Sequence, residues 1–151
     1  MTSEAKTLTG GCSAGGTGAQ TVQILLVDDH VATREEMRAL IVSKGDMEVI
    51  GESGSGEDAI EQARRLRPDV IVMDIFLPGM SGVEATRRIL QENPLIKVVA
   101  LSNYSGYHLV RAVRDAGGVG QVRKDHAFEE LIPAIRSVCA GKPYLGANVQ
   151  D

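Results

Sequence analysis

A chain of 151 residues is long enough for one domain with a hydrophobic core. Its apolar fraction of 43% excludes a disordered chain, and an aromatic content of 3% without tryptophan argues against stacking on bases as its main activity. The net charge of −4 argues against direct binding of nucleic acid or of an anionic membrane by this chain. No apolar run is long enough to span a bilayer. The two widely separated cysteines, Cys12 and Cys139, fit no metal spacing and come without a secretory context, so we expect a cytoplasmic location.

The first part of the chain, residues 1–21, is small, polar and without periodicity, and its centre at 10–18 is rich in glycine. It lacks the apolar segment of a signal peptide. It also precedes the first strand, whereas a nucleotide-binding loop follows one. We therefore expect a flexible N-terminal tail.

From residue 22 onward, short apolar runs alternate with amphipathic stretches. The apolar runs predict strands at 22–27, 47–52, 69–74, 96–102 and 119–123. Helical periodicity predicts helices at 31–44, 57–66, 82–93, 107–116 and 127–139. Ser55 lies three residues before Asp58, which is the spacing of a capping box at the start of the second helix. The alternation predicts one α/β domain at 22–145, a doubly wound five-stranded parallel sheet with five helices, and 146–151 as its C-terminal end or the start of a linker.

The third predicted strand carries four consecutive apolar residues at 70–73 and ends at Asp74. Such a run is typical of a strand buried on both faces, at the centre of a parallel sheet. A Pro-Gly turn follows shortly after, so Asp74 should stand at the carboxyl edge of the sheet, where open α/β folds bind their ligands. Alternatively, Asp74 simply begins the turn.

Polar residues close the neighbouring strands too: Asp28 and Asp29 follow the first, Ser102 ends the fourth, and Lys124 follows the fifth. In a parallel sheet these groups meet Asp74 at one edge. Carboxylates about 4 Å apart repel by roughly 4 kcal/mol per pair at an effective dielectric of about 20. A hard divalent cation such as Mg²⁺ among them resolves this repulsion. Together with the lysine and the hydroxyl, the acids suit phosphoryl transfer onto a carboxylate.

Each of these residues also has a simpler interpretation. Asp28 could cap the first helix, and Asp29 could complement its dipole. Ser102 could be a turn residue and Lys124 a solvated surface charge. His30 is not expected to bind metal, because no second ligand of its kind accompanies it.

The combination resembles the receiver domain of two-component response regulators, and in its details the NarL/FixJ-type subfamily. The resemblance covers 22–144. It rests on the following residues: Asp28-Asp29-His30 with Arg34, Asp74 followed by Leu77-Pro78-Gly79, Ser102, Ala116-Gly117, Lys124-Asp125 and the ending Ala140-Gly141-Lys142-Pro143-Tyr144-Leu145.

The resemblance implies a flavodoxin-like sheet with strand order 2-1-3-4-5 and a role for each site residue. Asp74 would accept a phosphoryl group from a histidine kinase or phosphotransfer protein, and Lys124 and Ser102 would contact the phosphoryl oxygens. The Mg²⁺ ligands would be Asp28, Asp29, Asp74 and the backbone carbonyl of Phe76. Such a protein is not an enzyme in the usual sense, since it catalyses only its own phosphorylation and dephosphorylation.

The resemblance also implies a phosphorelay switch that controls a partner or a DNA-binding output in transcription regulation, with a homodimer through the fourth and fifth helices as one assembly. The subfamily usually continues into a helix-turn-helix domain, which a chain ending at Asp151 does not include. An alternative is a receiver fold that acts as a protein-interaction module without phosphorylation. A phosphatase of the haloacid-dehalogenase type would need an Asp where Phe76 stands, and a flavodoxin is disfavoured because acids occupy the phosphate loop.

One position departs from the family pattern: Gln121 stands three residues before Lys124, where the family usually has Tyr or Phe. Aromatic coupling in its usual form is therefore not expected, and the signal should reach the fourth helix through Ser102 and the following loop. Phe76 and Tyr104 are expected to flank the path of water to the phosphoryl group and to slow its hydrolysis.

Overall fold

The computed structural model describes residues 21–103, 106–147 and 149 of the chain. Its six strands form one parallel sheet in the order β2-β1-β3-β4-β5-β6. The strands are β1 (Val22–Val27), β2 (Met47–Ser53), β3 (Val70–Asp74), β4 (Lys97–Ser102), β5 (Gly120–Arg123) and β6 (Tyr144–Leu145). The predicted order 2-1-3-4-5 is confirmed, and β6 is an additional edge strand.

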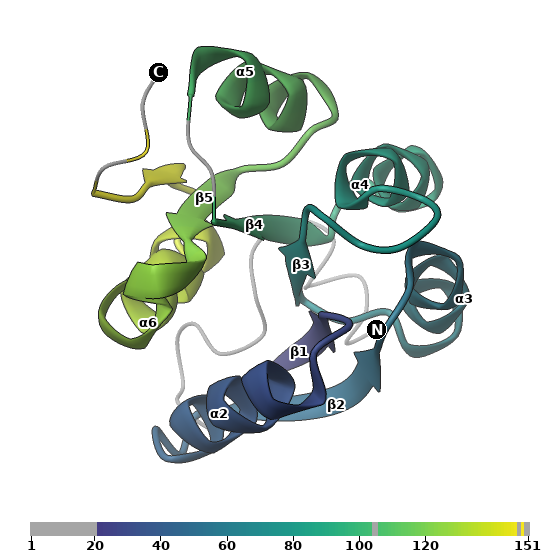
Figure 1. Ribbon diagram of the computed structural model, residues 1–151. Helices are drawn as coiled ribbons and strands as arrows, with labels where there is room; N and C mark the ends of the chain where they lie inside the picture. Colours follow the sequence, from purple (N-terminus) through teal and green to yellow (C-terminus); the bar gives the residue numbers. More distant parts are fainter. Residues whose placement is uncertain (1–20, 104–105, 148, 150–151) are drawn as a thin grey trace.

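Helices cover both faces of the sheet, with α2 and α6 on one face and α3, α4 and α5 on the other (Figure 1). The helices are α2 (Val31–Val42), α3 (Gly56–Leu66), α4 (Gly82–Glu92), α5 (Tyr107–Asp115) and α6 (Ala127–Cys139), and a short 3₁₀ helix, η1 (Lys124–His126), precedes α6. All ten predicted helices and strands are present, and their ends lie within two residues of the predicted ones. No helix in the described ranges is long and apolar enough to cross a membrane.

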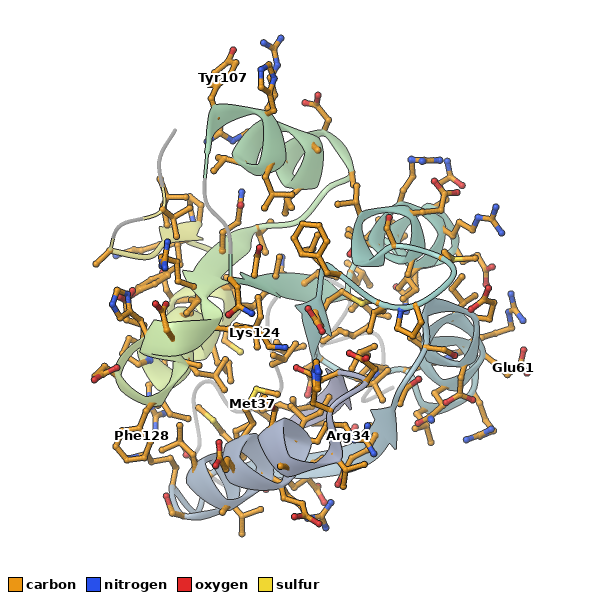
Figure 2. All side chains as sticks on the ribbon, viewed as in Figure 1. Arg34, Met37, Glu61, Tyr107, Lys124 and Phe128 are labelled. Carbon is orange, nitrogen blue, oxygen red and sulfur yellow. The ribbon has the colours of Figure 1, made fainter. Side chains whose placement is uncertain are left out.

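Two apolar clusters hold these layers together, because successive residues of a strand point to opposite faces. In β3, Val70 and Val72 join a cluster that includes Met37 of α2, while Ile71 and Met73 pack with α3 and α4. All five residues of β3 are buried, as its continuous apolar run predicts. Figure 2 shows Met37 pointing toward the sheet. Burying each such side chain contributes about 1.5–3 kcal/mol, which fixes the position of the strand that carries Asp74.

The start of α3 follows the predicted capping pattern, since the Ser55 hydroxyl accepts a hydrogen bond from the Asp58 N–H at 3.1 Å. The start of α2 differs from the simple interpretation of Asp28. His30 occupies the N-cap position, and the Asp28 carboxylate accepts a hydrogen bond from the His30 N–H at 2.8 Å, ahead of the helix. The Asp28 carboxylate therefore forms its hydrogen bond within the loop between β1 and α2, and Asp28 is not the N-cap residue of α2.

The extra strand β6 is held by Glu130 of α6. Its carboxylate accepts hydrogen bonds from the Tyr144 hydroxyl at 2.9 Å and the Ala147 N–H at 3.0 Å. The Gly146 N–H donates to the Gln121 carbonyl of β5 at 2.8 Å. The hydrogen-bonded chain therefore continues past the predicted domain end at residue 145.

Three expectations concern residues that lie wholly or partly outside the described ranges. The tail predicted at 1–21 lies outside them except for Thr21, and so does Tyr104. Within 146–151, residues 148, 150 and 151 are likewise outside.

Candidate functional site

The predicted site residues come together at the carboxyl edge of the sheet. Asp28 directly follows β1, Asp74 ends β3, Ser102 ends β4, and Lys124 directly follows β5. Because the strands are parallel and in register, with Ser102 paired to Arg123, their ends reach the same edge.

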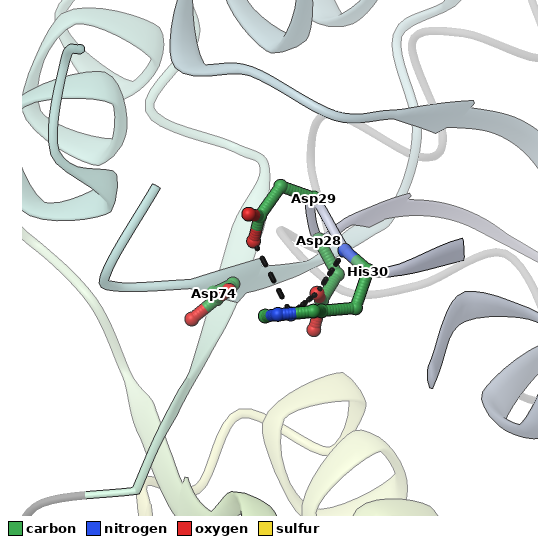
Figure 3. A group of neighbouring side chains, drawn as sticks. All are labelled: Asp28, Asp29, His30 and Asp74. Carbon is green, nitrogen blue, oxygen red and sulfur yellow. Dashed lines mark hydrogen bonds and ion pairs between the residues drawn. The ribbon is translucent and has the colours of Figure 1, made fainter. Parts of the chain in front are cut away.

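Three carboxylates and one imidazole form a cluster at this edge. One ligand atom from each of Asp28, Asp29, His30 and Asp74 lies within 4.8 Å of the others (Figure 3). Asp28 and Asp74 are buried, whereas Asp29 and His30 are exposed. The Nδ1 atom of His30 lies 3.3 Å from Asp28 Oδ1 and 3.4 Å from Asp29 Oδ1. His30, which was not expected to bind metal, thus lies at one rim of the cluster.

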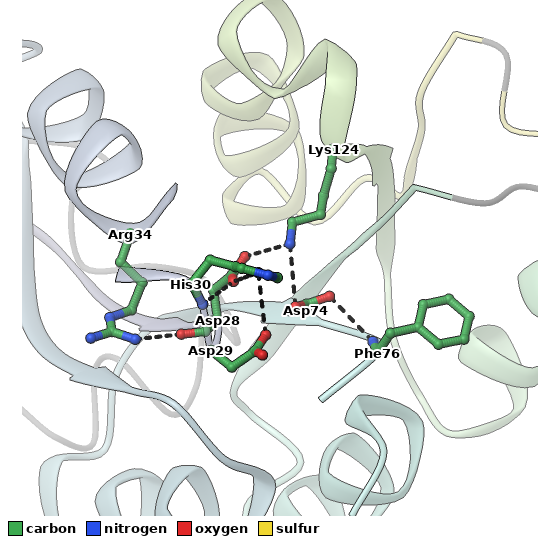
Figure 4. Close-up of polar contacts among 7 residues, drawn as sticks. All are labelled: Asp28, Asp29, His30, Arg34, Asp74, Phe76 and Lys124. Carbon is green, nitrogen blue, oxygen red and sulfur yellow. Dashed lines mark hydrogen bonds and ion pairs between the residues drawn. The ribbon is translucent and has the colours of Figure 1, made fainter. Parts of the chain in front are cut away.

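Lys124 links the two buried acids. Its Nζ atom lies 2.8 Å from Asp28 Oδ2 and 3.3 Å from Asp74 Oδ2 (Figure 4). Only 12% of its side chain is exposed, so the interpretation as a solvated surface charge is wrong. Burial alone would lower the pKa of Lys124, but its contacts with Asp28 and Asp74 outweigh this and raise the pKa above its ordinary value. The site therefore contains a firmly held cation between two buried carboxylates.

The Asp74 carboxylate is destabilised in its charged form. Burial raises the pKa of Asp74, and the negative charge of Asp28 raises it further, while Lys124 and the backbone N–H of Phe76, 3.2 Å from Asp74 Oδ1, oppose the rise. One ammonium group faces three carboxylates. The electrostatic balance of the site thus favours a further cation.

The donor set fits a hard divalent cation. Carboxylate oxygens are the ligands that Mg²⁺ prefers, and three of them lie within reach of one ion here. The Asp29 side chain is 31% exposed, which gives an ion and its remaining waters access from solvent.

Two other predicted residues are Ser102 and Phe76. Ser102 is buried at the end of β4. The Phe76 ring is exposed and points away from the Asp74 carboxylate (Figure 4). The predicted shielding of Asp74 by Phe76 would therefore require the ring to change its orientation.

Gln121, at the position where an aromatic residue is usual, is buried on β5. Its side-chain amide donates a hydrogen bond to the backbone carbonyl of Val110 in α5 at 3.0 Å. The strand that leads to Lys124 is thus hydrogen-bonded directly to α5, a link that the sequence did not predict.

Sequence reasoning missed two residues that shape the site. A Cβ atom on Gly82 would lie 2.1 Å from the backbone oxygen of Asp74, so only glycine lets α4 begin this close to the end of β3. The guanidinium of Arg34 donates a hydrogen bond to the backbone carbonyl of Asp28. The sequence indicated Arg34 only as part of the family motif. In the sequence, the position of Gly82 directly after Ser81, the residue that caps α4, could have pointed to this close approach.

Comparisons with known proteins agree with this geometry. The response regulator receiver domain matches residues 24–136. The response regulators GacA from Pseudomonas viridiflava and UvrY from Escherichia coli are each 35% identical over 128 residues, or 85% of this chain. The chain spans about 60% of the length of these curated relatives, with 60% of GacA and 59% of UvrY covered.

Solved structures match as well. A LuxR-family two-component response regulator from Aurantimonas sp. SI85-9A1 has 33% sequence identity and a TM-score of 0.83, over 86% of this chain and 93% of that one. The response regulator domain of Thermotoga maritima CheB has 29% identity and a TM-score of 0.76, over 82% of this chain and 100% of that one. The chain therefore belongs to the response regulator receiver domain family, as its motifs predict.

Proposed function

We propose that this chain is the receiver of a phosphorelay and accepts a phosphoryl group on Asp74 from a histidine kinase or a phosphotransfer protein. One observation carries the proposal: the Lys124 ammonium lies between the buried carboxylates of Asp28 and Asp74 at the open edge of the sheet. A lysine in that place can pair with phosphoryl oxygens on Asp74 as well as with the free carboxylates.

In the proposed reaction, a carboxylate oxygen of Asp74 attacks the phosphorus atom of a phosphohistidine. The new O–P bond forms as the P–N bond breaks, and the imidazole nitrogen of the donor leaves with the electron pair and takes up a proton. Lys124 balances charge on the phosphoryl oxygens, and the Ser102 hydroxyl donates a hydrogen bond to one of them. The chain acts only on its own aspartate, including the later hydrolysis, so it is not an enzyme with a separate substrate.

The reaction requires Mg²⁺ in this proposal. Asp28, Asp29 and Asp74 would hold the ion together with the backbone carbonyl of Phe76. A bound Mg²⁺ reduces the repulsion between the incoming phosphoryl oxygens and the carboxylates. The fit of three carboxylates within 4.8 Å supports this assignment.

The output we propose is a change in binding to a partner or in a DNA-binding activity that regulates transcription, in the cytoplasm. Homodimerisation through the fourth and fifth helices, α5 and α6, is one route to it. Tyr107 in α5 and Phe128 in α6 are 49% and 78% exposed, and both project outward in Figure 2. Exposed aromatic side chains of this kind are enriched at protein interfaces.

Labelling by acetyl phosphate tests the proposal. With Mg²⁺ present, the wild type should gain one phosphoryl group by mass spectrometry, and Asp74→Asn should gain none because an amide is a poor nucleophile. Asp125→Asn is the matched control, since Asp125 follows Lys124 but pairs with Arg123 outside the acid cluster. Labelling of Asp74→Asn at the wild-type rate would overturn the assignment of the acceptor. A wild type that takes up neither phosphoryl nor beryllofluoride would favour the interaction module without phosphorylation.

A further inference from the structure

Arg34 lies behind the acid cluster, on the first turn of α2, and contacts the backbone that carries it. We infer that Arg34 is a positioning residue for the cation site: it fixes the peptide between Asp28 and Asp29 so that both carboxylates face one ion. The inference rests on the proposed function, because it assigns a role toward the proposed Mg²⁺.

The backbone of Asp28 is held on both sides. Its N–H donates to the Ser53 carbonyl of β2 at 2.9 Å. Its carbonyl accepts from Nη1 of Arg34 at 2.5 Å, as the dashed line in Figure 4 shows. The Nε atom of Arg34 donates to Oε1 of Glu52 at 3.1 Å, and only 17% of the Arg34 side chain is exposed. Arg34 therefore joins α2 and β2 to this one peptide group.

That peptide decides where the Asp29 carboxylate points. The carbonyl of Asp28 and the N–H of Asp29 belong to one rigid plane, so rotation of the plane moves the Asp29 side chain. The Asp29 side chain itself is partly exposed and contacts His30 at 3.4 Å. A hydrogen bond to the backbone just before Asp29 is thus a direct way to hold its carboxylate beside those of Asp28 and Asp74.

Glu52 keeps the Arg34 charge in its place. A guanidinium this near the acids could pair with the carboxylates and compete with a cation, since Arg forms strong forked bonds to carboxylate. Glu52 of β2 offers Arg34 a carboxylate that is not part of the acid cluster. Arg38, one turn further along α2, binds the other oxygen of Glu52 at 2.8 Å and is about half exposed. Arg38 thus shares the Glu52 contact and provides a matched control.

The test is a titration of the ¹⁵N-labelled protein with MgCl₂, after treatment with a chelator, followed by NMR at the amides of Asp29 and Asp74. Arg34→Met, which keeps the stem and removes the donors, should weaken Mg²⁺ binding by about tenfold, the usual effect of losing a group that orients metal ligands. Arg34→Lys should bind Mg²⁺ with intermediate affinity. An ammonium can donate to the Asp28 carbonyl, but it does not reproduce the planar pair of donors by which Arg34 contacts Asp28 and Glu52 together. Arg38→Met should stay within about twofold of the wild type.

Amide hydrogen exchange without cation separates positioning from general stability. In Arg34→Met, exchange at Asp29 and His30 should accelerate while exchange in β3 and β4 stays at the wild-type rate. Equal Mg²⁺ affinity in Arg34→Met and wild type, or an equal loss in Arg38→Met, would overturn the role of Arg34 and leave the proposed function standing. Should Arg34→Met fail to fold, a wild-type Mg²⁺ affinity in Arg34→Lys would overturn the proposed role of the Arg34 guanidinium. A wild type without saturable Mg²⁺ shifts at Asp29 and Asp74 would overturn the cation site, and the role of Arg34 with it.

Discussion

The acid cluster should make the cation-free protein less stable than a variant with one charge fewer. The ligand atoms of the acids lie at most 4.8 Å apart, and at an effective dielectric of about 20 two charges at that limit interact by roughly 3.5 kcal/mol. The 3.3 Å pair of Lys124 and Asp74 interacts by roughly 5 kcal/mol. The repulsion of Asp74 by Asp28 and Asp29 therefore exceeds its attraction to Lys124 by about 2 kcal/mol. Burial of Asp74 acts in the same direction. We expect Asp74→Asn to raise the free energy of unfolding by about 2 kcal/mol at pH 7 in chelator.

The pH dependence of this gain follows from the direction of the pKa shift. Burial and the charge of Asp28 raise the pKa of Asp74 in the folded protein above its ordinary value. The folded state therefore binds the proton more tightly than the unfolded chain, so ionised Asp74 destabilises the fold at pH values above its folded pKa. This destabilisation disappears as the pH falls through the folded pKa toward the ordinary value of about 3.9. The advantage of Asp74→Asn should be largest at neutral pH and should shrink on acidification.

Urea unfolding with EDTA at pH 7.0, 5.5 and 4.5 measures both effects. Asp125→Asn should change the stability little at any of these pH values, because its pair with Arg123 is exposed and screened by solvent. An Asp74→Asn variant no more stable than wild type at pH 7 would show that the local dielectric screens the acids from one another. A gain that stays constant with pH would show that its source is the change of shape or hydrogen bonding, and not the charge.

Three further predictions concern Asp29, Gly82 and Gln121. Mg²⁺ should raise the melting temperature of the wild type, measured by differential scanning fluorimetry, and Asp29→Ala should abolish this rise, since ligand binding stabilises only a protein with an intact site. An unchanged rise in Asp29→Ala would place the ion elsewhere. Gly82→Ala should lower the free energy of unfolding by about 1–3 kcal/mol through overpacking against the Asp74 carbonyl. Gly54→Ala, whose Cβ would lie 3.6 Å from its nearest neighbour, should be tolerated, and equal urea midpoints for the two variants would refute the prediction. Gln121→Leu should lower the free energy of unfolding by about 1 kcal/mol and speed amide exchange in α5, because the Val110 carbonyl loses a donor. Amide exchange in α5 at the wild-type rate would show that the hydrogen bond from Gln121 does not hold the helix.

The sequence predicted the sheet well because its signals are local and repeated. Four apolar residues in succession predict β3 at the centre, and five alternations of strand and helix predict a doubly wound parallel sheet. The order of the first five strands followed from the resemblance to receiver domains. The sixth strand has only two residues, Tyr144 and Leu145, and periodicity cannot detect so short an element. Its place depends on Glu130, a carboxylate 14 residues earlier in the chain from Tyr144, and such a contact has no signature in the sequence.

The sequence predicted which residues form the site better than it predicted the contacts between them. Parallel strands place Asp28, Asp74 and Lys124 at one edge, and polar residues at strand ends are visible in the sequence. The link from Arg34 to a backbone carbonyl depends on how α2 is set against β1, and a motif residue carries no information about such a partner. The close approach of Gly82 to Asp74 likewise depends on the packing of α4.

Gln121 shows how one short strand could connect the site to the rest of the domain. Lys124, just past the end of β5, contacts the acids, and Gln121, three residues earlier, donates to Val110 of α5 and accepts from Gly146 beyond β6. The expectation that Ser102 and its loop alone lead to the fourth helix therefore omits a direct hydrogen bond. A phosphoryl group on Asp74 would draw Lys124 from its place between two carboxylates, and any movement of β5 would act on both contacts of Gln121. An amide hydrogen bond depends on distance and angle more sharply than the packing of a ring. A small displacement of β5 would thus suffice to weaken the contact with α5.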